Sequence, residues 1–155
     1  MAGVWRPRFL GGQESPSSLT MGQVLFTARN IVLAISAAST AAMLYVGAYQ
    51  VRAVEHLKCP LLGHGCEAVA DASFARPFGI PDGFIGAGLY GLLIVVALLN
   101  PQIAWVRYSI RGVAVVAAFV NILGVIDMSR FGAYCFYCLL TTALTPFLVW
   151  TAFLL

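Results

Sequence analysis

The sequence is poor in charged residues. Asp, Glu, Lys and Arg make up only 10% of its 155 residues, whereas 61% are hydrophobic and the mean hydropathy is +0.89. About a quarter of the residues of a soluble domain carry charge, so this composition excludes an ordinary soluble domain and indicates that lipid surrounds most of the chain. The formal net charge of +3 comes without any run of basic residues, which argues against a nucleic-acid-binding protein.

Cysteine is scarce as well. The four cysteines form two pairs, Cys59 with Cys66 in CPLLGHGC and Cys135 with Cys138 in CFYC. Their number is even, but the length and hydrophobicity of the chain exclude a small secreted scaffold built on disulfides. The chain also lacks a short signal-peptide core near its start, so we expect the first apolar run to be an uncleaved anchor.

Apolar residues are gathered in four long runs. Each run is close to the length of about 20 residues that an α-helix needs to cross the hydrocarbon core, and helices satisfy their backbone groups internally, as lipid requires. We therefore predict an all-α membrane protein with a bundle of four transmembrane helices. The predicted spans are about 31–51, 79–99, 106–127 and 134–155.

The first 28 residues differ from the rest because they are polar and irregular. Within them, GGQESPSS (11–18) has the composition of a disordered linker. We predict a disordered cytoplasmic tail over residues 1–28 and a single membrane domain over residues 29–155. The chain is still apolar at Leu155, so we expect no soluble domain to be appended to the last helix.

The connections between the predicted spans differ in length. Residues 52–78 form the one long polar loop, which carries Cys59 and Cys66. Residues 100–105 and 128–133 are predicted to be short turns, the first of them marked by the breaker Asn-Pro.

Two local patterns refine this organisation. Residues 67–76 are predicted to form a short interfacial helix with Val69 and Phe74 turned toward lipid or the mouth of a ligand site. Gly83, Ala87 and Gly91 are spaced as small-xxx-small, a pattern that lets membrane helices pack closely.

The basic residues give a weak orientation signal. Five fall on the side of the N-terminus and four on the opposite side, which slightly favours a cytoplasmic N-terminus. We predict a multi-pass protein of the cytoplasmic (inner) membrane with both termini in the cytoplasm. Two crossings separate Cys66 from Cys135, so the two cysteine pairs share one face in either orientation. The predicted face is extracytoplasmic, where disulfides persist.

The CFYC pair has features that favour redox chemistry. Cys135 and Cys138 are three residues apart at the start of a helix, so they share one helix face, and the partial positive charge of a helix N-terminus favours thiolates. A quinone dissolved in the bilayer could reach them as an oxidant. The loop pair, Cys59 and Cys66, could take electrons from a soluble protein and pass them on by thiol–disulfide exchange.

Other interpretations remain open at this stage. Cys59, His64, Cys66 and one cysteine of CFYC could form a Cys/His metal site, for which zinc is the natural candidate. A purely structural disulfide between Cys59 and Cys66 is a second alternative. Asp127 is predicted to be an interfacial acid, with proton relay beside a quinone as a lesser alternative.

Two segments resemble the vitamin K epoxide reductase (VKOR) family, specifically its bacterial homologues. They are CEAVADASFARPFGIPDGFIGAGLY (66–90) and GAYCFYC (132–138), and the resemblance covers residues 31–155. Its most specific elements are the loop cysteine pair, Phe-Gly-Ile-Pro (78–81), Gly86 with Tyr90, and the late CxxC.

The resemblance implies a four-helix bundle around a quinone and a role for each cysteine. Cys138 would face the quinone, Cys135 would exchange with Cys66, and Cys59 would meet a thioredoxin-like partner. The resemblance implies that the partner is a separate soluble protein, because some members carry it fused after a fifth helix that this chain lacks.

The chain departs from the family pattern at three positions. Ala72, followed by Ser73, stands where the family commonly has a serine near the quinone. Asp82 and Thr142 stand where vertebrate members have asparagine and tyrosine, so ubiquinone or menaquinone is favoured over a vitamin K-type quinone. The residues that the resemblance implies for quinone binding are Cys138, Asp82, Ala72, Ser73, Phe78 and Tyr90.

The sequence therefore predicts an oxidoreductase that acts on thiols and disulfides with a quinone acceptor. It would pass electrons from a thioredoxin-like protein through both cysteine pairs to a membrane quinone, and so support disulfide bond formation. The alternatives are a quinone or vitamin K epoxide reductase proper and, in another class, a Cys/His metal-binding membrane protein.

Overall fold

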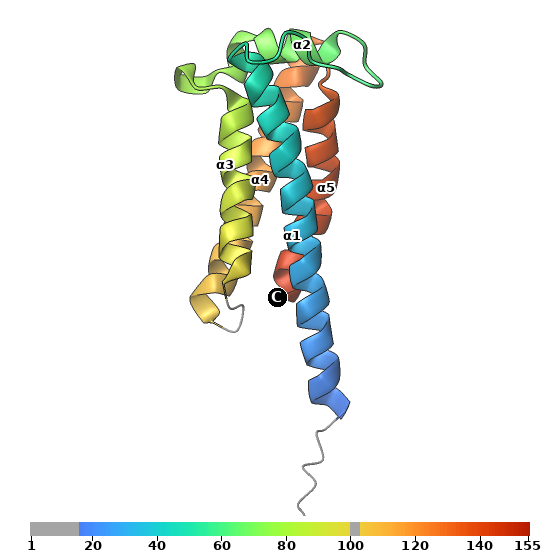
Figure 1. The fold of residues 1–155 in the computed structure, drawn as a ribbon, viewed down its shortest axis with the longest axis vertical. Coiled ribbons are helices and arrows are strands. Elements are labelled where there is room, and N and C mark those ends of the chain that lie inside the picture. Colours follow the sequence, from blue (N-terminus) through green and yellow to red (C-terminus); the bar gives the residue numbers. More distant parts are fainter. Residues whose placement is uncertain (1–15, 100–102) are drawn as a thin grey trace, which may run out of the picture.

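The computed structural model describes residues 16–99 and 103–155, and it confirms the predicted all-α fold. Four long helices run along one axis, and a short helix with two 3₁₀ turns lies across one end of them (Figure 1). The described residues contain no β-strand. The elements are α1 (Pro16–Gln50), α2 (Gly65–Asp71), η1 (Ser73–Ala75), η2 (Pro77–Gly79), α3 (Asp82–Leu98), α4 (Ala104–Phe131) and α5 (Phe136–Leu154).

The four long helices form the predicted membrane bundle. Helices α1, α4 and α5 are each long and apolar enough to cross a bilayer, whereas α3 is a shorter apolar helix of 17 residues. At 1.5 Å per residue, α3 is about 25 Å long, and exposed apolar residues such as Ile80 and Leu99 continue its surface at both ends. Large side chains on the outer faces are also apolar, among them Phe119 and Trp150, as a lipid-facing surface requires.

The first helix begins earlier than the sequence predicted. Residues 16–28 belong to α1 and not to an irregular tail, while residues 1–15 lie outside the described part of the chain. Tertiary packing explains the difference: Ala28 and Val32 are buried in the bundle core. Arg29 also donates hydrogen bonds from Nε to the Ala97 carbonyl oxygen at 2.9 Å and from Nη2 to that of Leu98 at 3.3 Å.

The third predicted span ends later than expected. Residues 128–131, predicted to begin a turn, form the last turn of α4. Gly132 ends this helix in the left-handed conformation, with φ of 78°, which glycine adopts without steric cost. The other predicted turn, residues 100–105, lies partly outside the described residues.

Close packing between α1 and α3 uses part of the predicted glycine pattern. A Cβ atom added to Gly83 would lie 2.7 Å from the Cα of Gly47, so the two backbones touch at this point. Ala87 is buried, but a Cβ atom at Gly91 would meet nothing within 4 Å. The pattern therefore predicted the close contact at Gly83 and was wrong at Gly91.

Both cysteine pairs lie at the end of the bundle that α2 covers. The chain reaches this end at the C-terminus of α1 and returns to it at the α4–α5 turn. The last residues of α3 and the first residues of α4 lie at the opposite end (Figure 1). Of the short helix predicted over residues 67–76, the first part belongs to α2, which ends at Asp71, and Ser73–Ala75 form the 3₁₀ turn η1. Arg52 and Tyr49 of the α1 end bind Asp71 of α2 at 3.1 and 3.0 Å, which fixes α2 across the bundle.

Candidate thiol–disulfide exchange site

The loop cysteines form a disulfide. The sulfur atoms of Cys59 and Cys66 are bonded to each other, and the two residues are seven positions apart in the sequence. Cys66 is fully buried, whereas Cys59 is only partly buried and is followed by the exposed residues Pro60 and Leu61. A soluble thiol can therefore approach the disulfide from the Cys59 side and not from the Cys66 side.

The CFYC cysteines are free thiols at the start of α5. Cys135 is the residue before the helix and is fully buried, and Cys138 lies in its first turn. A hydrogen bond from the Cys138 thiol, helped by backbone N–H groups of Tyr137 and Cys138, lowers the pKa of Cys135. The shift has the direction that the helix N-terminus suggested.

The buried cysteine of the loop touches the start of α5. The backbone N–H of Phe136 donates a hydrogen bond to Sγ of Cys66 at 3.3 Å. On the adjacent residue, a Cβ atom at Gly65 would lie only 2.6 Å from the carbonyl oxygen of Tyr134. Cys66 and Cys135 consequently lie in one buried cluster, although 69 positions separate them in the sequence. The two predicted pairs are brought together at this point.

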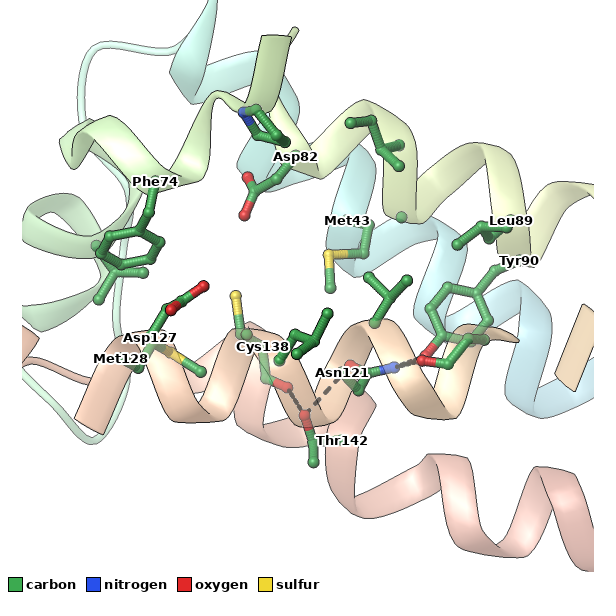
Figure 2. A pocket seen from close by; sticks show the side chains of 18 residues that line it. Met43, Phe74, Asp82, Leu89, Tyr90, Asn121, Asp127, Met128, Cys138 and Thr142 are labelled. Carbon is green, nitrogen blue, oxygen red and sulfur yellow. Dashed lines mark hydrogen bonds between the residues drawn. The ribbon is translucent and has the colours of Figure 1, made fainter. Parts of the chain in front are cut away.

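A cavity of about 260 Å³ lies on the other side of the CFYC pair, between α1, α3, α4 and α5. Figure 2 shows the Cys138 sulfur and the carboxyl groups of Asp82 and Asp127 pointing into it. Most of its remaining lining is apolar. The lining residues are Met43, Val69, Phe74, Pro77, Asp82, Ile85, Gly86, Leu89, Tyr90, Ala117, Val120, Asn121, Leu123, Gly124, Asp127, Met128, Cys138 and Thr142.

The quinone-binding residues suggested by the resemblance divide into two groups. Cys138, Asp82 and Tyr90 line the cavity, as does Thr142. Ala72, Ser73 and Phe78 are outside its lining. These three belong to the segment from α2 to η2, which contributes Val69, Phe74 and Pro77 instead.

Phe78, Ala72 and Ser73 lie outside the cavity lining for different reasons. Phe78 has a φ of 59°, which turns the chain outward, and its side chain is 99% exposed. Ala72 is buried where α2 ends and η1 begins, and Ser73 is exposed. Phe74 covers the cavity in their place, packed edge-to-face against Phe131 of α4 with the ring centroids 5.6 Å apart.

Asp82 is held by Gln50, a residue that the sequence analysis did not single out. Nε2 of the buried Gln50 donates to Oδ1 of Asp82 at 2.6 Å and to the carbonyl oxygen of Ala75 at 3.2 Å, while its Oε1 accepts from the backbone N–H of Gly83 at 3.2 Å. One side chain thus joins the end of α1, the turn η1 and the start of α3. No spacing rule points to this residue, because its side-chain partners are 20–33 positions away.

A second polar group that the sequence analysis missed is Asn121 of α4. Its Nδ2 donates to the Tyr90 hydroxyl of α3 at 2.8 Å and to Thr145 Oγ1 of α5 at 3.2 Å. Its Oδ1 accepts hydrogen bonds from Thr141 and Thr142, which also donate to the carbonyl oxygen of Cys138. Asn121 therefore links three helices beside the turn that carries Cys138 (Figure 2). The available signal was a polar residue within an apolar run.

The two loop histidines lie beside Glu67. Nδ1 of His56 and Nδ1 of His64 are each 3.6 Å from a carboxylate oxygen of Glu67. The backbone N–H of Leu57 donates to the same carboxylate at 3.1 Å, and this hydrogen bond lowers the pKa of Glu67. Glu67 thereby fixes the start of the disulfide loop to α2.

The arrangement gives no support to the alternative metal site. Within residues 16–99 and 103–155, no group of three or more His, Cys, Asp or Glu side chains is placed to hold a metal ion. Cys59 and Cys66 are joined to each other, and disulfide sulfurs do not offer the thiolates that zinc binds.

A disulfide and a dithiol gathered at one end of a membrane bundle, beside a mainly apolar cavity, define a membrane thiol–disulfide oxidoreductase. Residues 30–153 match the sequence model of the vitamin K epoxide reductase family, and because the match covers most of the chain, the protein belongs to that family. Members of the family generally use quinones and thioredoxin-like partners. No curated protein and no solved structure matches the chain significantly.

Proposed function

We propose that this protein is a quinone-dependent thiol oxidase. It takes electrons from a separate thioredoxin-like protein through Cys59 and Cys66, passes them to Cys135 and Cys138, and delivers them to a membrane quinone, supporting disulfide bond formation. The observation that carries the proposal is the position of Cys66. Its buried sulfur touches the N-terminus of α5 beside Cys135, while Cys138 faces the cavity on the other side.

The first step is an exchange with the partner. A thiolate of the partner attacks Sγ of Cys59, which is the accessible sulfur of the loop disulfide. Cys66 leaves as a thiolate, and the hydrogen bond from the Phe136 N–H at 3.3 Å stabilises its charge. The second partner thiolate then releases Cys59, so the partner is oxidised and the loop pair is reduced by two electrons.

The second step moves these electrons inward. The Cys66 thiolate attacks Sγ of Cys135 in an oxidised Cys135–Cys138 disulfide, and Cys138 leaves as a thiolate toward the cavity. Cys59 next attacks Cys66, which restores the loop disulfide and frees Cys135. The products are a loop disulfide and a CFYC dithiol, the redox state that the structure contains. The lowering of the Cys135 pKa makes this cysteine a better leaving group in the last exchange.

The cavity residues fit a quinone ring. Its lining is mainly apolar, with Asp82, Asn121 and Thr142 as polar groups on three different helices, which is the composition expected of a small-molecule site. A quinone held there supplies the acceptor for two electrons and two protons. Cys138 lies at the wall of the cavity, Asn121 and Thr142 hold its turn in place, and Phe74 restricts the access of water from the α2 side.

The tip of the disulfide loop is the surface that meets the partner. Leu61 is 78% exposed and Leu62 is 39% exposed beside the accessible Cys59, so a partner whose reactive thiol lies within an apolar rim fits this tip. The orientation proposed from the sequence places the tip on the extracytoplasmic face of the inner membrane, where the partner and its disulfide-containing substrates are found.

Four cysteine variants in lipid nanodiscs test the proposal. With a reduced thioredoxin-like protein and ubiquinone, Cys59→Ala, Cys66→Ala, Cys135→Ala and Cys138→Ala should each abolish quinone reduction. With a small membrane-permeant dithiol, the two loop variants should retain activity, because that donor reaches the CFYC pair directly. Ser129→Ala, an exposed residue of α4 that bonds only to its own helix, is the control. Equal behaviour of all four variants with the small dithiol would refute the two-pair relay.

A further inference from the structure

Asp127 is a carboxyl group in the cavity for which the relay has no role. It lies near the end of α4 at the depth of the CFYC pair, and it is partly buried. Figure 2 shows its carboxyl group pointing into the same space as the Cys138 sulfur. A carboxyl group at such a position in a membrane protein is costly, because lipid and apolar side chains solvate charge poorly. Its presence therefore calls for a chemical explanation.

The two acids of the cavity have different surroundings. Asp82 accepts a hydrogen bond of 2.6 Å from Gln50 and is fixed at the start of α3. By contrast, no hydrogen bond or ion pair joins Asp127 to any other residue within the described ranges 16–99 and 103–155. Arg130, one turn away on the same helix, is exposed. Both oxygens of Asp127 are thus available to take up and release a proton, whereas Oδ1 of Asp82 is engaged by Gln50.

We propose that Asp127 carries protons from the CFYC dithiol to the bound quinone. This inference rests on the function proposed above and assigns the proton path that the electron path requires. Oxidation of Cys135 and Cys138 breaks two S–H bonds and forms one S–S bond, and it releases two electrons and two protons. The electrons and both protons are taken up by the quinone, which is the oxidant.

The path uses atoms that face the cavity. The Asp127 carboxylate accepts the proton of the Cys138 thiol, which leaves a thiolate able to donate electrons, and it then gives that proton to an oxygen of the quinone. The Cys135 proton follows through Cys138, its partner in the CFYC pair at the start of α5. Asp127 ends each cycle as the carboxylate with which it began, so atoms and charge balance.

Asp127→Asn removes the proton acceptor and keeps the shape of the side chain. Pre-reduced protein in nanodiscs is mixed with ubiquinone, and oxidation of the CFYC pair is followed by alkylation and mass spectrometry. A positioned acid–base group typically contributes between 10² and 10⁴ in rate, so the variant should oxidise its dithiol about 100-fold more slowly. Added formate should restore part of the rate by carrying the proton, and Asp127→Glu should retain activity. Glu55→Gln is the matched control, since Glu55 is exposed and outside the cavity.

A second readout needs no quinone. In a Cys135→Ser background, the S–H stretching band in the infrared spectrum reports on Cys138 alone among the residues of the CFYC pair. Asp127→Asn should shift this band, because the substitution removes a carboxylate charge that faces the same cavity as the thiol, and Glu55→Gln should leave it unchanged. The rate of exchange between the loop pair and the CFYC pair should be the same in the wild type and in Asp127→Asn, which shows that the variant is folded.

The outcomes separate this inference from the proposed function. Wild-type protein that fails to oxidise its dithiol with quinone would refute the proposed function itself. A wild-type rate in Asp127→Asn would overturn the role of Asp127 while leaving the relay in place. A slow variant with no formate rescue and an unshifted S–H band would also overturn it, because Asp127 would then act only on the structure.

Discussion

Gly65→Ala is expected to separate the two cysteine pairs without changing any cysteine. Gly65 begins α2 immediately before Cys66, and a Cβ atom there would lie 2.6 Å from the carbonyl oxygen of Tyr134. Because ordinary contact begins at 3.4 Å, α2 and the α4–α5 turn must move apart by about 0.8 Å. Gly65 does not have a positive φ, and alanine is a better helix former than glycine, so the substitution introduces no backbone strain of its own.

The expected effect falls on one step of the relay. A misplacement of about 1 Å in a reacting pair can reduce a rate by about 100-fold, so transfer between Cys66 and Cys135 should slow by about 10- to 100-fold. Direct oxidation of the CFYC dithiol by quinone should stay near the wild-type rate, because the cavity lies on the other side of Cys138.

Single-turnover experiments measure the two steps separately. The loop pair is reduced with a thioredoxin-like protein, and transfer to the CFYC pair is followed by alkylation and mass spectrometry. Gly88→Ala is the matched control, since a Cβ atom there would meet nothing within 4 Å. Transfer at the wild-type rate in Gly65→Ala would refute the reasoning, as would an equal loss in both variants.

Three further predictions concern the framework of the site. Gly83→Ala should destabilise the bundle by about 1–3 kcal/mol, the usual cost of overpacking, because its Cβ atom would lie 2.7 Å from the Gly47 Cα. A thermal unfolding midpoint no lower than that of Gly88→Ala would contradict this prediction. Gln50→Leu should lower the free energy of unfolding by about 2–3 kcal/mol, because it leaves buried polar partners without hydrogen bonds. An unchanged free energy of unfolding would show that these hydrogen bonds do not stabilise the junction between α1 and α3. The pKa of Glu67 is lower in the folded protein than in the unfolded chain, where it is about 4.3. The carboxylate therefore stabilises the loop fully above about pH 4.3, and this stabilisation is lost as the pH falls through the pKa of the folded state. Hydrogen exchange at the Leu57 amide should therefore accelerate in acid in the wild type but not in Glu67→Gln, and identical pH profiles would count against the contact.

Much of the fold follows from the sequence because a chain in lipid must satisfy its backbone hydrogen bonds internally. Long apolar runs must become helices, and counting crossings was sufficient to place Cys66 and Cys135 at the same end of the bundle. The helix ends were less predictable because they depend on tertiary contacts. Arg29 extends α1 by binding carbonyl oxygens at the end of α3, about 70 residues further along the chain.

The site residues that belong to a sequence motif could be predicted, whereas those that act only through the folded arrangement could not. The cysteine pairs and Asp82 were found through their spacing and through the family resemblance. Gln50 and Asn121 were not, because each acts through partners on other helices. Phe78 was predicted to bind the quinone, but its side chain lies outside the cavity, and Phe74 of the preceding turn η1 lines the cavity instead. Which side chain of an irregular segment points inward is decided by backbone dihedral angles that no periodic pattern reports.

The most direct test of the relay is to trap the bond between its two halves. In Cys138→Ser, the Cys135 thiolate can attack Sγ of Cys66 in the loop disulfide, and Cys59 leaves as a thiolate. No Cys138 thiol is present to release Cys135 again, so the protein should accumulate a Cys66–Cys135 disulfide with Cys59 free. Mass spectrometry of the digested, alkylated protein identifies this bond. The account predicts Cys66–Cys135 as the dominant disulfide in Cys138→Ser. A dominant Cys59–Cys66 bond, with Cys135 left as a free thiol, would contradict transfer between the two pairs.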